Sequence, residues 1–597
     1  MKITYPSSVL KLIILLIILP YNIILSDVRY VSKTGTSLFP YTSWESAADS
    51  IQKCVNICNS GDTIYVANGE YKEQITLRSG LTLTGAGIDS CIIDARDFVS
   101  PVWNIGSING ADSCIIKNIY IKVSNNYDGN GITIFNHYMV CENIKIDNCG
   151  NGIMFGNINC VIKNCIITNF SHTGILNLSG SYGILYKPQI INNLLVGKAN
   201  TSVTAIWDEF TNTTLKNNIV CLDENDSRGY YNENGNSTLY NNLIIGNSFW
   251  FGIDNGTDTS YVYNNVVIGG SHIGGAAYMI YSSGYLQVLK NNIAIDGVIG
   301  FYTAGGMDKD SNFKYNDSWN NKTADYLFFT PDSTNLSIDP MFVNDTSDFH
   351  LQLFSPLIDR GDPSILDIDS TRSDIGLFGG PYGESYKYKD LAPKAPHGLN
   401  LTMDTNTVTI KWQKNTETDF NHFNLYRDTV AGFTANANTL VLSLTDTTYH
   451  HFILPGIKKY FYKLTALDNQ GNISPLSEEL GINIVSVNDK HQVLSDYRLF
   501  QNYPNPFNPS TLIPYRLKER GYVKLTIYDI KGEQVAVLIN KYQDAGYYEV
   551  EFMGTKKDKG KTFVDKIASG IYLYRLDVKN ENNIPIYFDM KKMVLLK

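Results

Sequence analysis

Short apolar runs rich in Ile, Val and Leu recur along the first half of the chain, and an asparagine stands just ahead of each run. The spacing between these asparagines is 21 to 29 residues, about 25 on average. A repeat of this length indicates a solenoid, and β-branched runs separated by Gly, Asn, Asp and Ser leave no room for a helix in each repeat. The pattern therefore predicts a parallel β-helix. Because Asn tolerates left-handed backbone geometry, the asparagines can stack at one turn of each coil, which indicates a fold and not catalysis. They are Asn118, Asn143, Asn164, Asn193, Asn218, Asn242, Asn265, Asn292 and Asn316.

The segment before the repeats has a helical pattern of apolar positions. Ser43 is a candidate N-cap for a helix over residues 44 to 58. A solenoid needs a cap over its open end, and an amphipathic helix serves that role. The apolar face of this predicted helix comprises Trp44, Ala47, Ala48, Ile51, Val55 and Cys58.

The N-terminus has the pattern of a signal peptide over residues 1–26. Lys2 and Lys11 supply the positive charge, and residues 12–19 form an unbroken apolar run that is too short for a standard membrane-spanning helix. We place the cleavage near Ser26 and predict no transmembrane segment in the mature chain.

The composition changes the picture in three ways. At 597 residues the chain is too long for one ordinary core, so several domains are expected. The net charge of −9, with no lysine run, argues against a nucleic-acid partner. The nine cysteines all lie between Cys54 and Cys221, several of them inside the repeat runs. We interpret them as small buried fillers of the coil, with a disulfide framework or a metal site as the alternatives.

Residues 27–385 resemble the secreted right-handed parallel β-helix (pectate-lyase-like) proteins. Three pieces carry this resemblance: the opening from Tyr30-Val31-Ser32 through residues 67–71, the asparagine-marked coils, and the closing run with Asp339-Pro340 and Ser355-Pro356. The resemblance covers about 350 residues. It specifies the fold but not the chemistry, because neither the paired-Asp pattern of polygalacturonases nor the arginine motif of pectate lyases is present.

Two further domains follow, joined by linkers at residues 386–392 and 488–496. Residues 393–487 contain an early Trp412, a central Tyr426 and a late Tyr460-Phe461-Tyr462 run, and they resemble a fibronectin type III sandwich. Such modules usually act as spacers or bind, and do not catalyse. The fold class predicted for the whole chain is all-β: a right-handed parallel β-helix with a helical cap, followed by two Ig-like β-sandwich domains.

Residues 497–597 carry the most specific resemblance. The proline-rich entry at 502–511, the alternating runs at 523–529 and 569–576, and the final 592–597 resemble the type A C-terminal sorting domain of the type IX secretion system, whose core is similar to the hook-capping-protein Ig-like fold. Asp529-x-x-Gly532 fits a hairpin turn between two of these strands. The resemblance implies the secretion machinery as a partner, passage through the outer membrane, removal of this domain, and attachment to the cell surface or release. An ordinary Ig-like domain is the alternative.

Chemistry on a β-helix is expected on the outer face of a parallel sheet. Alignment of the coils predicts an inward row ending in Ile253, Ile280 and Phe301, so the next residue of each coil should point outward. This outward row reads Thr133, Met154, Trp207, Tyr231, Asp254, Tyr281 and Tyr302.

The aromatic members of this row, Trp207, Tyr231, Tyr281 and Tyr302, are candidates for stacking on sugar rings. Glu209 should face the same way as Trp207 and lie two coils, or about 10 Å, from Asp254. Such a carboxylate pair suits an inverting glycosidase, and both residues are candidate catalytic groups. A plain stacking ladder, sugar binding without chemistry, and catalysis all fit the pattern.

The loop after Cys221 is a second candidate site. Asp223, Glu224 and Asp226 could hold calcium, the usual cofactor of β-helix lyases, and Arg228 could stabilise or abstract a proton at a uronate α-carbon. The alternative is a solvated turn. We therefore predict a secreted, surface-sorted protein that engages extracellular polysaccharide. The rivals are a polysaccharide lyase or glycoside hydrolase, and a surface adhesin or structural stalk; the sequence does not decide whether the protein is an enzyme.

Overall fold

The computed structural model describes residues 26–98, 106–123, 129–135, 138–156, 159–179, 186–224, 226–256, 259–281, 286–304, 312–404, 407–453, 459–484, 496–502, 505–508, 510–553 and 567–596. These residues form two compact units. One comprises the chain up to Leu351 together with Ser355–Tyr388, and the other comprises Gln352–Phe354 and Lys389–Lys597. Nearly all of the signal-peptide prediction lies outside the described residues. Among the described residues, no helix is long and apolar enough to cross a membrane.

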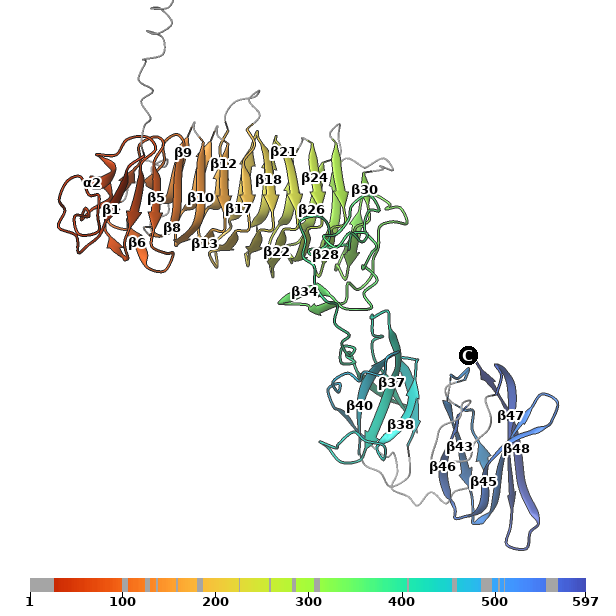
Figure 1. The fold of residues 1–597 in the computed structure, drawn as a ribbon. Coiled ribbons are helices and arrows are strands. Elements are labelled where there is room, and N and C mark those ends of the chain that lie inside the picture. Colours follow the sequence, from red (N-terminus) through yellow and green to blue (C-terminus); the bar gives the residue numbers. More distant parts are fainter. Residues whose placement is uncertain are drawn as a thin grey trace, which may run out of the picture. The chain divides into compact units, whose positions relative to one another are not determined.

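The first unit is a parallel β-solenoid whose coils each contribute up to three short strands, stacked side by side in Figure 1. One face is an eleven-stranded parallel sheet in the order β32-β29-β26-β23-β20-β17-β14-β11-β9-β7-β4. The strands are β4 (Ile75–Thr76), β7 (Gly106–Asn109), β9 (Asn130–Phe135), β11 (Asn151–Gly156), β14 (Thr173–Asn177), β17 (Thr204–Glu209), β20 (Arg228–Glu233), β23 (Phe251–Asn255), β26 (Ala276–Tyr281), β29 (Ile299–Ala304) and β32 (Ala324–Leu327).

The other two faces merge into one sheet because β8 and β10 run through both of them. The first of these faces stacks β1 (Val28–Val31), β2 (Thr63–Val66), β5 (Thr82–Gly85), β8 (Cys114–Lys122), β10 (Met139–Asp147), β12 (Cys160–Lys163), β15 (Gln189–Ile191), β18 (Asn212–Lys216), β21 (Asn236–Tyr240), β24 (Ser260–Tyr263), β27 (Gln287–Lys290) and β30 (Phe313–Lys314). The second stacks β3 (Gly69–Tyr71), β6 (Cys91–Asp94), the later halves of β8 and β10, β13 (Ile166–Phe170), β16 (Leu194–Gly197), β19 (Ile219–Cys221), β22 (Leu243–Gly246), β25 (Val266–Gly269), β28 (Ile293–Ile295) and β31 (Asp317–Trp319).

Asparagines mark the turn between these two faces, as the repeat pattern predicts, but they occupy two positions and not one. The first position has left-handed backbone geometry and holds Asn118, Asn143, Asn164, Asn192, Asn217, Asn241, Asn264 and Asn291. The second is buried and holds Asn193, Asn218, Asn242, Asn265, Asn292 and Asn316. The sequence alignment mixed the two positions, because the first three coils carry Ile119, Ile144 and Cys165 at the buried one.

The buried asparagines form a continuous amide ladder. The Asn193 side-chain amide donates to the Asn218 carbonyl oxygen at 2.9 Å, and the same bond recurs from Asn218 to Asn242. Each side chain also accepts from the backbone N–H at the same position of the preceding coil, as Asn242 does from Asn218 at 3.0 Å and Asn193 does from Cys165 at 2.8 Å. The ladder thus satisfies backbone and side-chain donors that would otherwise be unpaired inside the coil, where an unmade hydrogen bond is costly.

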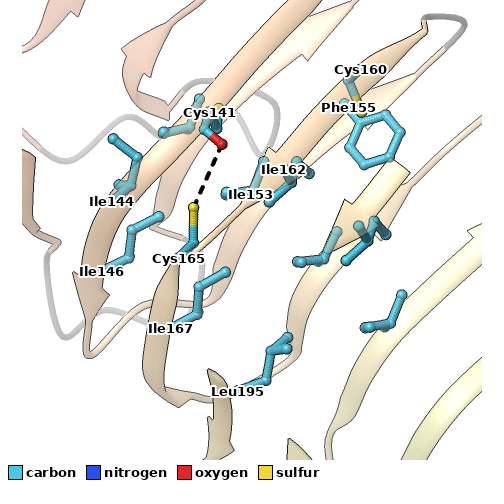
Figure 2. Packing of buried hydrophobic residues seen from close by; sticks show 14 of the residues in the cluster. Cys141, Ile144, Ile146, Ile153, Phe155, Cys160, Ile162, Cys165, Ile167 and Leu195 are labelled. Atoms are coloured by element: carbon cyan, nitrogen blue, oxygen red, sulfur yellow. Dashed lines mark hydrogen bonds between the residues drawn. The ribbon is translucent and has the colours of Figure 1, made fainter. Parts of the chain in front are cut away.

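Cysteines and aliphatic residues fill the coil interior. Cys141, Cys160 and Cys165 pack among isoleucines in Figure 2, and the Cys165 thiol donates to the Cys141 carbonyl at 3.8 Å. All nine cysteines are free, and all except the half-buried Cys221 are buried. This confirms the interpretation of the eight buried cysteines as small core fillers, whereas Cys221 is only partly enclosed.

The predicted cap helix is much shorter than expected. Helix α2 covers only Ile51–Val55, and its N-cap is Ser50, whose hydroxyl accepts from the Lys53 N–H. The prediction of a helix from residue 44 capped by Ser43 is wrong. Residues 44–48 instead bond to the first strand region, where the Ala48 N–H donates to the Tyr30 carbonyl at 2.9 Å.

The end of the first unit folds back on the solenoid. The hairpin β33 (Phe342–Asn344) and β34 (Asp348–Leu351) shares an apolar cluster with residues of β22, β25 and β28. The amide of Asn264 donates to the Asp374 carbonyl at 2.9 Å, so the turn asparagines also hold this closing segment.

The second unit contains two pairs of antiparallel sheets, and with the solenoid they confirm the predicted all-β architecture. The first pair is β35-β36-β39 with β38-β37-β40-β41, and the second is β42-β43-β46 with β45-β44-β47-β48. The Asp529–Gly532 turn joins β44 to β45 as predicted, since Gly532 has a φ of 85° and its N–H donates to the Asp529 carbonyl. The strands are β35 (Asn400–Asp404), β36 (Thr407–Lys411), β37 (Phe420–Asp428), β38 (Leu440–Leu444), β39 (Thr448–Phe452), β40 (Lys459–Asp468), β41 (Leu480–Asn483), β42 (Arg498–Leu499), β43 (Ser510–Leu517), β44 (Gly521–Asp529), β45 (Gln534–Gln543), β46 (Gly546–Met553), β47 (Gly570–Lys579) and β48 (Pro585–Leu595).

Candidate functional site

The eleven-stranded sheet brings most of the predicted outward row into register. Trp207 of β17 pairs with Tyr231 of β20, and Tyr231 pairs with Asp254 of β23. Along the next two strands the row continues through Met279 and Tyr302. Since parallel strands repeat about every 4.8 Å, the five side chains span about 20 Å.

Tyr281 is not in this row, and its predicted register is wrong by two residues. Met279 holds the position expected for Tyr281, and Tyr278 holds the inward position expected for Ile280. The buried Tyr278 ring stacks on Phe301 at 4.5 Å between ring centroids, and its hydroxyl donates to the Asn265 carbonyl at 2.9 Å. A tyrosine with a satisfied hydroxyl can fill the core as an isoleucine does, which shifts the alignment. Tyr281 pairs with Ala304, two residues further along the strands.

Arg228 lies at the centre of the site. Its guanidinium carbon is 4.5 Å from the centre of the Tyr231 ring and 5.0 Å from that of the Trp250 ring. Its Nε is 3.5 Å from the Asp254 carboxylate oxygen Oδ2. Trp207 packs edge-on against Tyr231 at 5.6 Å between ring centroids. Cation–π contacts on two rings and a carboxylate behind them hold the guanidinium in place.

Asp254 is buried under this arrangement. The residue is 1% exposed, and among the described residues its Oδ1 has no hydrogen-bond partner. Burial raises the pKa of Asp254 to about 6, and Arg228 acts in the opposite direction. An acid so enclosed is not open to a polysaccharide, and its geometry suits the positioning of Arg228.

The accessible acids are Glu209 and a residue that the sequence reasoning missed, Glu233. The two are register partners on β17 and β20, and both are half-buried. Burial, and next to it the charge of Glu233, raises the pKa of Glu209. Glu233 follows Tyr231 by two residues, just as Glu209 follows Trp207. Alignment of these two coils would therefore have predicted Glu233 beside Glu209.

The two halves of the row differ in character. Toward Trp207 the surface is aromatic and charged. Toward Tyr302 it is apolar, because Tyr302 packs with a cluster that includes Phe251, Met279 and Ile299. The aromatic and charged half therefore carries the functional groups.

The structure does not bring the three acids of the loop after Cys221 together. An Asp223 oxygen accepts from the Asn247 side chain at 3.1 Å, and a Glu224 oxygen accepts from the Asn200 N–H at 2.9 Å. Asp226 lies 3.2 Å from the His272 Nε2. Calcium binding by Asp223, Glu224 and Asp226 stays a prediction.

His272 and Trp250 connect this loop to the site. The His272 ring lies 6.3 Å from the Trp250 ring, which in turn stacks on Phe251 at 4.7 Å. Neither His272 nor Trp250 belongs to the predicted set. Trp250 precedes the strand by one residue, outside the alternating pattern used to find outward positions.

The comparisons with known proteins do not assign a family. No family model and no curated protein matches the sequence. Solved structures with partial likeness include the Clostridium perfringens spore cortex lytic enzyme SleM, at 22% identity and a TM-score of 0.13 over 18% of this chain and 32% of that one. The catalytic unit of the GH87 alpha-1,3-glucanase from Streptomyces thermodiastaticus has 12% identity and a TM-score of 0.29, over 48% of this chain and 64% of that one. The alpha-L-rhamnosidase from Dictyoglumus thermophilum has 13% identity and a TM-score of 0.14, over 34% of this chain and 28% of that one.

This chain thus spans less than two thirds of the first two of these structures. At these identities and TM-scores the activities of those proteins are not transferred to it.

Proposed function

We propose that this protein is exported, sorted to the cell surface by type IX secretion, and binds extracellular polysaccharide through the face around Arg228. The observation that carries the proposal is a group of three half-buried rings: Tyr231 and Trp250 lie against the Arg228 guanidinium, and Trp207 packs edge-on against Tyr231. Aromatic faces stack on the apolar faces of sugar rings, and fixed rings do so with little loss of conformational entropy.

The charge of the site favours a neutral polysaccharide. The negative charge of Asp254 balances the positive charge of Arg228, whose Nε lies 3.5 Å away. Glu209 and Glu233 therefore give the site an excess of negative charge. This pair of carboxylates would repel a uronate polymer, whereas carboxylate oxygens accept hydrogen bonds from sugar hydroxyls. Neutral glucans, mannans, galactans and xylans are therefore the expected ligands.

Glycoside hydrolysis is the second candidate, and it rests on the pairing of Glu209 with Glu233. Neighbouring coils are about 4.8 Å apart, close to the carboxyl separation of about 5–5.5 Å in retaining glycosidases. The raised pKa of Glu209 suits a general acid. The pair predicted from sequence, Glu209 with Asp254, is less suited because Asp254 is enclosed.

Two features of the chain support the export route. The first 26 residues have the pattern of a signal peptide, and residues 497–597 resemble a type IX sorting domain. In a type IX-secreting bacterium, deletion of residues 497–597 should leave the protein in the periplasm, and fusion of this segment to an exported reporter should carry the reporter to the surface. Surface delivery of the truncated chain would contradict this part of the proposal.

The binding test is affinity electrophoresis of the full chain in gels that contain neutral or acidic polysaccharides. We expect retention by at least one neutral polysaccharide, and about 30-fold weaker retention for Trp207→Ala, since an aromatic contact at the centre of an interface contributes about 2 kcal/mol. Tyr65→Ala is the matched control, because Tyr65 is an exposed tyrosine (41%) on another face of the solenoid.

The same samples are assayed for new reducing ends and for unsaturated products. Reducing ends that Glu209→Gln and Glu233→Gln both abolish would establish the hydrolase. Unsaturated product would establish a lyase. No retention and no product on any polysaccharide would refute the proposal and favour the adhesin or stalk alternative.

A further inference from the structure

Three carboxylates meet in the second unit, away from the site around Arg228. Asp390 precedes the first strand of this unit, Asp419 lies just before Phe420 at the start of β37, and Asp468 is the last residue of β40. One carboxylate oxygen from each lies within 4.8 Å of the other two. Oxygens on opposite sides of a bound Ca²⁺ are about 4.6–5.2 Å apart, so these three fit within a single coordination shell.

The fold holds Asp468 rigidly in place. Its Oδ1 accepts from the backbone N–H groups of Gln470, Gly471 and Asn472 at 3.0, 2.7 and 2.8 Å. The Asn472 side chain donates both to Asp468 Oδ2 at 2.9 Å and to Asp390 Oδ1 at 3.1 Å. One turn thus orients two of the three carboxylates.

Asp419 lacks such support. The residue is only 7% exposed, and within the described part of this unit no side chain donates a hydrogen bond to its carboxylate. Nor does any described Lys, Arg or His form an ion pair with Asp390, Asp419 or Asp468. Three like charges at this spacing destabilise one another unless a cation lies among them.

We propose that Asp390, Asp419 and Asp468 bind one calcium ion. The three side chains offer oxygen and no nitrogen or sulfur, which selects hard cations over zinc or copper. Calcium is favoured over magnesium because it accepts irregular geometry, whereas magnesium demands a near-ideal octahedron and gives up water reluctantly.

The ion would fasten the entry of the chain into this unit. Lys389 forms a parallel bridge with Gln352, and the Thr418 hydroxyl donates to the Phe354 carbonyl at 2.8 Å. Two segments enter this unit, 352–354 and 389–390. They bond to each other, and the first of them also bonds to Thr418, the residue just before Asp419. A cation that joins Asp390 to Asp419 and Asp468 would order this entry.

The test is calcium titration of the full chain, stripped with chelator, by isothermal calorimetry and by thermal unfolding. We expect a saturable site with a dissociation constant of about 10⁻⁵–10⁻³ M and a rise of several degrees in the unfolding transition of this unit. Asp419→Asn should weaken binding at least tenfold and abolish the rise. Asp446→Asn, which removes an exposed acid of the same unit, should leave both unchanged.

Two further variants separate the outcomes. Asp390→Asn changes an exposed ligand, so it should weaken binding even if Asp419→Asn fails to fold. Asp226→Asn addresses the separate loop predicted in the solenoid. Two results would overturn the proposal. One is no calcium binding at 10 mM, roughly ten times the dissociation constant of the weakest extracellular sites. The other is calcium binding that Asp226→Asn abolishes while Asp390→Asn and Asp419→Asn both preserve it.

Discussion

Asn242→Ala is the sharpest test of the idea that the asparagine ladder stabilises the fold. The Asn242 side chain is buried and makes four hydrogen bonds. Its Oδ1 accepts from the Asn218 N–H at 3.0 Å and from the Asn218 amide at 2.9 Å. Its Nδ2 donates to the Asn265 Oδ1 at 2.9 Å and to the Leu215 carbonyl at 3.2 Å.

The cost of this substitution follows from those bonds. A hydrogen bond contributes about 1 kcal/mol net, so four of them contribute about 4 kcal/mol. The Asn218 N–H, moreover, is left without a partner in a dry interior. Because every 1.4 kcal/mol is a factor of ten, the opening equilibrium of the neighbouring coils should rise about 1,000-fold.

Hydrogen exchange of the full chain, read by mass spectrometry, measures this opening locally, which suits a solenoid whose coils contact only their neighbours. Peptides over β18, β21 and β24 should exchange about 1,000-fold faster in the variant. Asn236→Ala is the control: Asn236 also bonds to the neighbouring coils, to Asn212 at 2.8 Å, but it is exposed and should change exchange about twofold. A change below tenfold for Asn242→Ala would refute the reasoning.

Three further predictions follow from buried groups. Tyr278→Phe should lower the free energy of unfolding by about 1 kcal/mol, measured by guanidinium denaturation, because it removes the buried hydrogen bond from the hydroxyl to the Asn265 carbonyl, which keeps the Ile293 N–H as a donor at 2.9 Å; an unchanged midpoint would contradict this. The raised pKa of Asp254 means that its contribution to stability is fully present below about pH 4 and is lost as the pH rises through about 6. Relative to Asp254→Asn, the free energy of unfolding of the wild type should therefore fall by up to about 3 kcal/mol between those pH values. If the free energies of unfolding of the two proteins changed in parallel with pH, Asp254 would not titrate in this range. In the folded protein a thiol reagent should modify Cys221 first, because the other eight cysteines are buried. The modified sites are identified by mass spectrometry of protein digests, with Cys221→Ser as the control. Equal labelling of several cysteines, or no labelling of Cys221, would contradict the packing.

The repeat of asparagines predicted the solenoid because one coil is a physical unit, and most coils carry an asparagine at the same turn. The short helix could not be predicted in the same way. The backbone N–H groups of Ile51 and Gln52 donate to the Glu73 carboxylate, at 2.8 Å each, so a residue more than 20 positions away fixes where the helix starts. No local pattern contains that contact.

The candidate site was predicted in part for the same reason. Trp207, Tyr231 and Asp254 come together because strand alternation and the coil period place them. Arg228 was assigned to the separate loop after Cys221, because it lies three residues before Tyr231 and alternation does not place it on the same face. Nothing in the alternation shows that Arg228 covers Asp254, since burial depends on how the guanidinium lies across Tyr231 and the adjacent Trp250.

Hydroxyl-radical footprinting of the full chain, with and without neutral polysaccharide, tests polysaccharide binding at this face most directly, because aromatic side chains are modified according to their exposure. The account predicts protection of Trp207, Tyr231 and Trp250, and no protection of Tyr65 on another face. Unchanged modification of all three rings in the presence of a polysaccharide that retains the protein on gels would contradict it.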